Sequence, residues 1–261
     1  MKTLVPVFFS AGDAAAPLLA TAVNSLKTNA SARYAYHIHI LTDDFSSANR
    51  RKLERFRGED FALDFHPLRE SLRALPWGRE LEEATLQTLA ECYCFLIPEL
   101  FPAYDKAICL DADLVVSGDI SQLYCEPLGN KSVGAVVDFS AENSALTEHL
   151  NYVNSAVLLL DCRRIREEQL SLRLAEWARR YSLEGIAPAQ EYLNDLCRDG
   201  IRYLDPDWNA RPADSPNDAD SPKIVRFDLL PSPPSGGSFR YNNLFWKYAA
   251  TSGYGPEILI A

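Results

Sequence analysis

The sequence predicts an α/β protein with a mostly parallel central sheet, and two observations support that prediction. Short apolar or alternating segments at residues 4–9, 34–41 and 61–66 have the pattern of strands. Residues 15–26 and 46–56, which lie between them, have the pattern of helices. Strands that alternate with helices favour parallel pairing, because parallel neighbours need a long crossover connection. Ligands of such sheets bind beyond the carboxyl ends of the strands.

The N-terminal segment also resembles a secretory signal. It has an early Lys, an apolar run and several small residues. The apolar run at residues 4–9 is shorter than a signal core, however, and Gly12 and Asp13 follow it closely. We therefore expect the first strand of the sheet here, followed by a helix.

Later elements follow from the same kind of pattern. Residues 163–181 carry apolar side chains on one helical stripe and predict a single amphipathic helix. Residues 205–222 are rich in Pro and Asp without periodicity and predict a long loop. No internal repeat divides the chain, and 261 residues lie within the range of one α/β unit. We therefore expect a single domain over residues 1–261.

The composition excludes some classes of partner. An apolar content of 47% and a charged content of 24% are ordinary for a globular protein. The net charge of −10 argues against nucleic acid as a partner, because nucleic-acid binding depends on basic surfaces. It also gives no attraction to an anionic membrane. No stretch of the sequence approaches the length of a membrane span.

The cysteine and histidine residues do not form a metal-binding pattern. The six cysteines include no Cys-x-x-Cys pair and no disulfide-dense pattern, so we expect reduced thiols and a cytoplasmic protein. His37 and His39 alternate within a predicted strand, and we expect them to be structural or solvent-facing instead of metal ligands. His66 and His149 lie elsewhere in the chain.

The most informative segment is KAICLDADLVVSGDISQLY, at residues 106–124. Asp111 and Asp113 follow the end of a short buried strand, and their i, i+2 spacing directs both carboxylates to one side. Two adjacent carboxylates repel each other, so a divalent cation between them is the usual reason for this arrangement. A solvated turn is the alternative explanation of a bare Asp-x-Asp. Asp119 predicts an N-terminal cap for the helix that follows.

The wider segment CLDADLVVSGDISQLY resembles the metal- and sugar-nucleotide-binding segment of family 8 glycosyltransferases. These are retaining enzymes of the GT-A fold, a Rossmann-like α/β fold. Further similar segments occur in the same order at residues 89–102, 151–161, 189–194 and 241–249. The resemblance therefore covers nearly the whole chain and implies a single GT-A domain. Bacterial members of the family often build the outer sugars of lipopolysaccharide.

The resemblance implies a role for individual residues. Asp111 and Asp113 match the carboxylates that bind the metal, Mn²⁺ or Mg²⁺, and the nucleotide. Asn154 matches an amide that contacts the sugar, and Gln190 matches the amide beneath the anomeric carbon. The catalytic candidates are thus Gln190, Asp111 and Asp113. The positions assigned to the nucleotide sugar are Ala11, Asp13, Asp111, Ala112, Asp113, Asn154 and Arg226.

The sequence departs from the family pattern at several of these positions. The family completes its metal site with a His in a late strand, and the matching strand at residues 223–228 has Arg226 at that position. Residues 235–239 stand where the family has a Lys-Pro-Trp loop. The first loop offers one carboxylate and no aromatic ring to stack on a base.

Two functions are compatible with a site that matches the family pattern at some positions and departs from it at others. The first is a retaining glycosyltransferase that moves a hexose from a nucleoside diphosphate sugar, such as UDP-hexose, to a saccharide or glycolipid acceptor. Arg226 would then supplement or replace the metal, because its planar fork suits phosphate oxygens. The second is a non-catalytic relative that acts as a binding or partner protein. In that case Arg226 pairs with Asp111 or Asp113 and fills the cation site.

Overall fold

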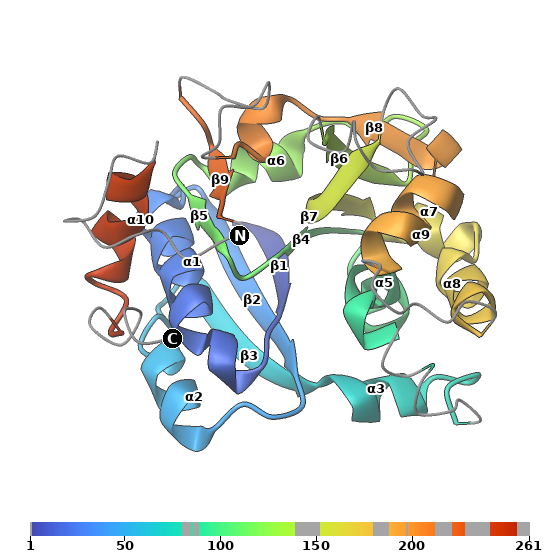
Figure 1. The fold of residues 1–261 in the computed structure, drawn as a ribbon, viewed down its shortest axis with the longest axis horizontal. Helices are drawn as coiled ribbons and strands as arrows, with labels where there is room; N and C mark the ends of the chain where they lie inside the picture. Colours follow the sequence, from blue (N-terminus) through green and yellow to red (C-terminus); the bar gives the residue numbers. More distant parts are fainter. Residues whose placement is uncertain are drawn as a thin grey trace.

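The structure is a computed structural model that describes residues 2–79, 85, 89–138, 152–179, 188–196, 198–211, 221–227 and 241–254. Its centre is a seven-stranded sheet of order β3-β2-β1-β4-β7-β6-β8, accompanied by a two-stranded sheet, β5-β9 (Figure 1). The strands of the large sheet are β1 Thr3–Ser10, β2 Tyr34–Thr42, β3 Phe61–Pro67, β4 Lys106–Leu110, β6 Val133–Val137, β7 Val153–Asp161 and β8 Ile201–Tyr203. The small sheet consists of β5 Leu114–Val116 and β9 Ile224–Arg226.

Helices cover both faces of the large sheet. Figure 1 shows α1, α2 and α10 on one side, and α5, α7, α8 and α9 on the other. The helices are α1 Ala16–Asn29, α2 Ser47–Glu54, α3 Leu68–Ala74, α5 Ile97–Leu100, α6 Ile120–Cys125, α7 Cys162–Glu167, α8 Leu170–Ala178, α9 Pro188–Leu196 and α10 Asn242–Ala249. Asp119 caps α6 as predicted, because its side chain accepts a hydrogen bond from the Ser121 backbone.

The pairing pattern confirms the predicted sheet. β1 pairs in parallel with β2 and β4, β2 pairs in parallel with β3, and β6 pairs in parallel with β8. Only the β4–β7 and β6–β7 pairs of this described sheet are antiparallel. The mostly parallel strands are covered on both faces, which explains their nearly continuous apolar runs.

The first strand lies inside the sheet, between β2 and β4. Val5, Val7 and Phe9 pack into the core beneath α1, whereas Phe8 packs into the core on the opposite face. All four side chains are fully buried. The prediction that residues 4–9 form a strand is therefore confirmed.

The prediction of a single helix at residues 163–181 is wrong. The chain instead forms α7 and α8, and Gln169 between them has a φ of 54°. This left-handed conformation is unusual for a residue with a side chain and interrupts the helix. Ile165 and Leu170 are buried on either side of the break, so the apolar stripe continues although the helix does not. Residues 180 and 181 lie outside the described residues.

His37, His39 and His66 form a hydrogen-bonded cluster between β2 and β3. His39 is only 2% exposed, and its ring stacks on Phe8 at 4.5 Å. Its two nitrogens lie 3.0 Å from His66 Nε2 and 2.9 Å from the Tyr104 hydroxyl. The cluster supports the predicted structural role of His37 and His39. His149 lies outside the described residues.

Acid is expected to destabilise the protein through His39. Burial, aided by the nearby His37 and His66, lowers the pKa of His39 from 6.5 to about 2. Between these values the unfolded chain binds a proton that the folded chain does not, so stability falls as the pH falls below 6.5. One such proton gives a slope of about 1.4 kcal/mol per pH unit. Urea unfolding on both sides of this pH measures the slope.

The matched variant for this experiment is His39→Asn. It replaces the titrating imidazole ring by an amide that can still form hydrogen bonds in the cluster. We expect the pH dependence of its unfolding free energy to be flatter by about one proton. A slope equal to that of the wild type would show that the folded protein binds a proton at His39.

Candidate active site

Asp111, Ala112 and Asp113 form a bend between β4 and β5. The Asp111 backbone N–H donates to the Ala156 carbonyl at 2.9 Å, and the Asp113 carbonyl accepts from the Phe227 backbone at 2.8 Å. The two carboxylates therefore emerge beyond the end of a buried strand, as predicted. They do so from a bend whose backbone is fixed at both ends.

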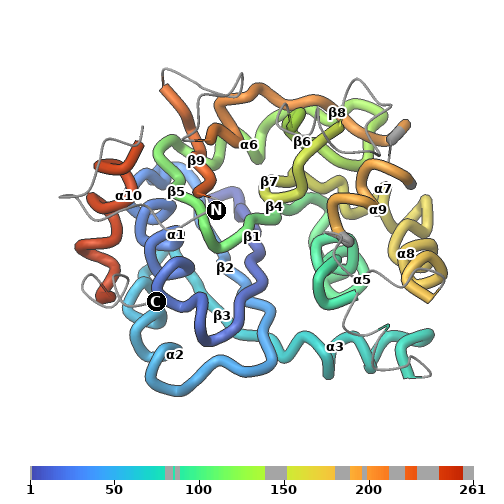
Figure 2. The backbone as a smooth tube through the Cα atoms, in the orientation of Figure 1, coloured from blue at the N-terminus to red at the C-terminus, as the bar shows by residue number. Residues whose placement is uncertain are grey.

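Strand β9 brings Arg226 to this bend from far along the chain. β9 pairs antiparallel with β5, and Leu114 is opposite Arg226 in the register. Figure 2 shows the two segments side by side. The predicted strand at residues 223–228 is thus confirmed over residues 224–226, and Arg226 lies opposite the residue that follows Asp113. Its contact with the nucleotide sugar stays a prediction.

Asn154 of β7 accepts hydrogen bonds from three parts of the fold. Its Oδ1 accepts from Arg226 Nη1 at 2.8 Å, from Asn209 Nδ2 at 3.0 Å and from the Ala156 backbone at 2.9 Å. The Asn154 residue is only 4% exposed. Arg226 and Asn209 both come from the C-terminal part of the chain, so Asn154 links that part to the central sheet.

The amide nitrogen of Asn154 completes a network with Gln190. Asn154 Nδ2 donates to Asp138 Oδ2 at 3.0 Å and to Gln190 Oε1 at 3.2 Å. Asp138 is itself paired with Arg211, with 3.4 Å between the carboxylate and the guanidinium. The structure therefore brings the sequence-predicted residues Asn154, Gln190 and Arg226 together through direct hydrogen bonds.

Helix α9 holds Gln190 against β7. Asn194, one turn along the helix, accepts from the Val153 backbone N–H and donates to the Val153 carbonyl, both at 2.8 Å. Asn194 Nδ2 also donates to the Gln190 carbonyl at 2.8 Å. These bonds dock the helix on the strand that carries Asn154. The position of Gln190 is therefore set by the backbone as well as by its own side chain.

Burial and a neighbouring charge shift the pKa of Asp111 in opposite directions. Loss of contact with water raises the pKa of Asp111, and the positive charge of Arg226 lowers it, with a net shift upward. Arg226 thus stabilises the ionised form of a carboxylate that the protein interior disfavours.

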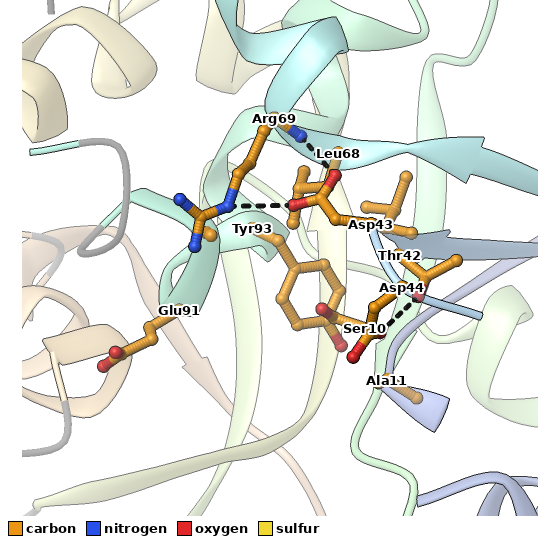
Figure 3. A pocket seen from close by; sticks show the side chains of 12 residues that line it. Ser10, Ala11, Thr42, Asp43, Asp44, Leu68, Arg69, Glu91 and Tyr93 are labelled. Carbon is orange, nitrogen blue, oxygen red and sulfur yellow. Dashed lines mark hydrogen bonds and ion pairs between the residues drawn. The ribbon is translucent and has the colours of Figure 1, made fainter. Parts of the chain in front are cut away.

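A cavity of about 500 Å³ lies beyond the carboxyl ends of β1 and β2 (Figure 3). Arg69 donates from its backbone to Asp43 Oδ1 at 2.8 Å, and its Nε pairs with Asp43 Oδ2 at 3.1 Å. Tyr93 donates to the Leu110 carbonyl at 2.8 Å, which connects the cavity to the residue before Asp111. The cavity is lined by Ser10, Ala11, Gly12, Leu41, Thr42, Asp43, Asp44, Leu68, Arg69, Ala90, Glu91 and Tyr93.

One of the two residues of the first loop that were predicted to bind the nucleotide sugar lines the cavity. Ala11 lines it, whereas Asp13 is not among its lining residues. Asp13 Oδ1 instead accepts from the Ser46 backbone and from Asn49 Nδ2, each at 2.8 Å. These hydrogen bonds lower the pKa of Asp13 and tie the loop to the start of α2. A nucleotide contact by Asp13 stays a prediction.

The polar side chains that line the cavity were not predicted from the sequence. Asp43, Asp44 and Arg69 follow the ends of β2 and β3. Their position immediately after predicted strands was a usable signal, because the ends of parallel strands converge on the ligand side of the sheet.

Comparison with known proteins identifies the family. The family model described as glycosyl transferase family 8 matches residues 6–227. The chain belongs to this family.

A putative glycosyltransferase of Haemophilus influenzae is 23% identical over 117 residues, which make up 42% of this chain and 36% of that protein. A probable galacturonosyltransferase 14 of Arabidopsis thaliana is 45% identical over 60 residues, which make up 22% of this chain and 11% of that protein. The matches therefore span only about a third and a tenth of these two relatives.

Solved structures of family 8 glycosyltransferases show that the chain has the GT-A fold. The galactosyltransferase LgtC, solved with donor and acceptor sugar analogs, matches 95% of this chain and 96% of its own, with a TM-score of 0.72 and 20% identity. The bifunctional glycosyltransferase WbbM matches 99% of this chain and 51% of its own, with a TM-score of 0.73 and 18% identity. GlyE of Streptococcus pneumoniae matches 98% of this chain and 63% of its own, with a TM-score of 0.67 and 20% identity.

Two further observations concern the described residues. No helix among them is long and apolar enough to cross a membrane. No three His, Cys, Asp or Glu side chains among them are grouped so that they could hold a metal ion.

Proposed function

We propose that this glycosyltransferase is a retaining hexosyltransferase that uses a nucleoside diphosphate sugar, with UDP-hexose as the first candidate donor. The observation that carries the proposal is the hydrogen-bonded set of Arg226, Asn154 and Gln190 beside the Asp111–Asp113 bend. In a family 8 chain these are the positions expected to face the diphosphate, the sugar and the anomeric carbon. The proposed acceptor is a saccharide or a glycolipid such as lipopolysaccharide, reached in the bacterial cytoplasm.

The proposed chemistry needs charge stabilisation more than covalent catalysis. The bond between the anomeric carbon and the diphosphate oxygen breaks, and its electron pair leaves with the diphosphate. The acceptor hydroxyl forms the new bond on the same face, and its proton passes to the departing oxygen. Arg226 stabilises the negative charge that develops on that oxygen. Gln190 lies on the opposite face of the sugar and stabilises the electron-poor anomeric carbon.

The family resemblance also implies a divalent metal. Asp111 and Asp113 would hold Mn²⁺ or Mg²⁺, because carboxylate oxygens are the ligands that hard cations prefer. When bound, the metal would add positive charge beside the leaving diphosphate. The protein groups described here fit such a centre only in part, since Arg226 stands where the family has its His and no third acidic, His or Cys side chain joins the two aspartates. The diphosphate oxygens would have to complete the set.

The hydrogen bonds of the Asn154 side chain also fit a second function, that of a non-catalytic binding protein. Its oxygen accepts three hydrogen bonds and its amide nitrogen donates two. A sugar must therefore displace one of these partners in order to contact the Asn154 side chain. In the non-catalytic alternative the Arg226 network remains closed, and the chain serves as a binding or partner protein.

Gln190→Ala tests the proposed catalytic role of Gln190. If Gln190 acts on the anomeric carbon, this variant should lose turnover by roughly a hundredfold and keep its affinity for the donor. Donor affinity is measured by the rise in thermal midpoint with UDP-hexoses, because a ligand of the native state raises it. Turnover is measured by release of the nucleoside diphosphate. Loss of donor binding with normal turnover at saturation would limit Gln190 to a binding role.

A further inference from the structure

The side chain of Asn194 joins helix α9 to β7 in the way that a neighbouring strand would. Asn194 Oδ1 accepts from the Val153 N–H, and Nδ2 donates to the Val153 carbonyl, both at 2.8 Å. The ladder between β4 and β7 ends with the bond from the Asp111 N–H to the Ala156 carbonyl. Val153 lies beyond the end of that ladder, and the Asn194 amide satisfies both of its backbone groups.

The same amide also holds the turn of α9 that carries Gln190. Asn194 Nδ2 donates to the Gln190 carbonyl at 2.8 Å, and Gln190 Oε1 accepts from Asn154 Nδ2 at 3.2 Å. Asn154 directly follows Val153 in β7. Asn194 therefore ties the Gln190 backbone to the same strand that holds the end of the Gln190 side chain. A shift of the helix along this strand would move the Gln190 amide relative to Asn154.

Apolar burial holds α9 in the protein independently of Asn194. Tyr192 and Leu193 are fully buried, and the Tyr192 hydroxyl donates to the Leu170 carbonyl. Apolar contacts are not directional, so they favour a docked helix without fixing its position along β7. Hydrogen bonds prefer a narrow range of lengths and angles, so those of Asn194 set that position.

We propose that Asn194 is a positioning residue for sugar transfer, which sets the place of the Gln190 amide at the anomeric carbon. This inference rests on the proposed function, since it takes Gln190 to be the group that acts on the sugar. Asn194 acts through Gln190 and does not itself touch the donor. A misplacement of about 1 Å can lower turnover by about a hundredfold, so the effect of a positioning residue is measurable.

The first test is Asn194→Ala, with release of UDP from UDP-glucose and UDP-galactose as the measure of turnover. We expect turnover at saturating donor to fall by about tenfold to a hundredfold. Donor affinity, measured by the rise in thermal midpoint, should stay within about threefold of the wild type. Asn194→Asp keeps the acceptor for the Val153 N–H but turns an oxygen toward the Val153 and Gln190 carbonyls. It should lose at least as much turnover.

Asn29→Ala is the matched control. Asn29, the last residue of α1, is partly buried like Asn194 and also makes three hydrogen bonds. Its Nδ2 donates to the Ser25 and Val116 carbonyls at 2.9 Å and to the Tyr248 hydroxyl at 2.8 Å. We expect a similar loss in the free energy of unfolding, measured in urea, and unchanged turnover.

A double-mutant cycle shows whether Asn194 acts through Gln190. If it does, Asn194→Ala should lower turnover no further in a protein that already carries Gln190→Ala. An equal loss in both backgrounds would give Asn194 an effect independent of Gln190 and overturn the inference. A loss of turnover that Asn29→Ala shares would overturn it as well.

The outcomes distinguish this inference from the proposed function. Loss of turnover in Gln190→Ala with normal turnover in Asn194→Ala would overturn the inference alone. Normal turnover in Gln190→Ala would overturn both, and so would a wild type that binds the sugar nucleotides without releasing UDP.

Discussion

Replacing Asn154 by Leu is expected to destabilise the protein by about 3–5 kcal/mol and to abolish sugar transfer. Leucine has the same branched shape and the same number of side-chain heavy atoms as asparagine and is not smaller, so the loss comes from hydrogen bonds and not from a cavity. The change removes five hydrogen bonds at once. Partners that remain buried without a replacement each cost about 1–3 kcal/mol. Urea unfolding measures the free-energy difference.

Asn209→Leu is the matched control for this prediction. It removes one of the three donors to the Asn154 oxygen and leaves the bonds to Arg226 and Gln190 in place. Its effect on the unfolding free energy should be less than half that of Asn154→Leu. If Asn154→Leu stays within about 1 kcal/mol of the wild type, which is the effect of one ordinary hydrogen bond, the network does not stabilise the protein as described.

Replacing Asp111 or Asp113 by Asn should lower transfer by about a thousandfold or more without unfolding the protein. Each carboxylate is proposed to act on the diphosphate, with a metal or with Arg226, and removal of one group that stabilises developing charge costs several kcal/mol of activation energy. Asn is nearly the same size and removes a carboxylate next to another carboxylate, so the fold should be as stable as before.

The comparison for these variants is Asp199→Asn. Asp199 is exposed and lies in a short helical turn before β8, so its replacement changes the net charge equally without touching the site. Donor turnover and urea midpoints are measured for all three proteins. Normal turnover in both Asp111→Asn and Asp113→Asn would remove these residues from the proposed mechanism.

The sequence predicted the parts of the site that depend on strand ends and on matched family segments. Asp111 and Asp113 follow a strand that is buried because of its own apolar run, and Arg226 lies in a short strand whose register with β5 brings it to the bend. The contact between Asn154 and Gln190 was not predicted, because it depends on how α9 docks on β7. That docking rests on Asn194, for which the sequence gives no local signal.

Side-chain direction in loops does not follow from the local sequence pattern. Asp13 follows the first strand, and its carboxylate accepts hydrogen bonds from Ser46 and Asn49. Its contact with the nucleotide stays a prediction. Asp43 and Arg69, which line the cavity, were not predicted.

The break between α7 and α8 was also missed. Gln169 adopts a left-handed conformation that Gly usually provides, so no glycine marked the end of the helix.

Proton NMR during slow hydrolysis of a nucleoside diphosphate sugar tests the central claim most directly. Water can replace the unknown acceptor, and the anomeric signal reports which face of the sugar was attacked before mutarotation. With UDP-α-glucose or UDP-α-galactose, a retaining hexosyltransferase should release the α anomer first, and Gln190→Ala should release it far more slowly. First release of the β anomer would contradict retention. Absence of any release from a protein that binds the donor would favour the non-catalytic alternative.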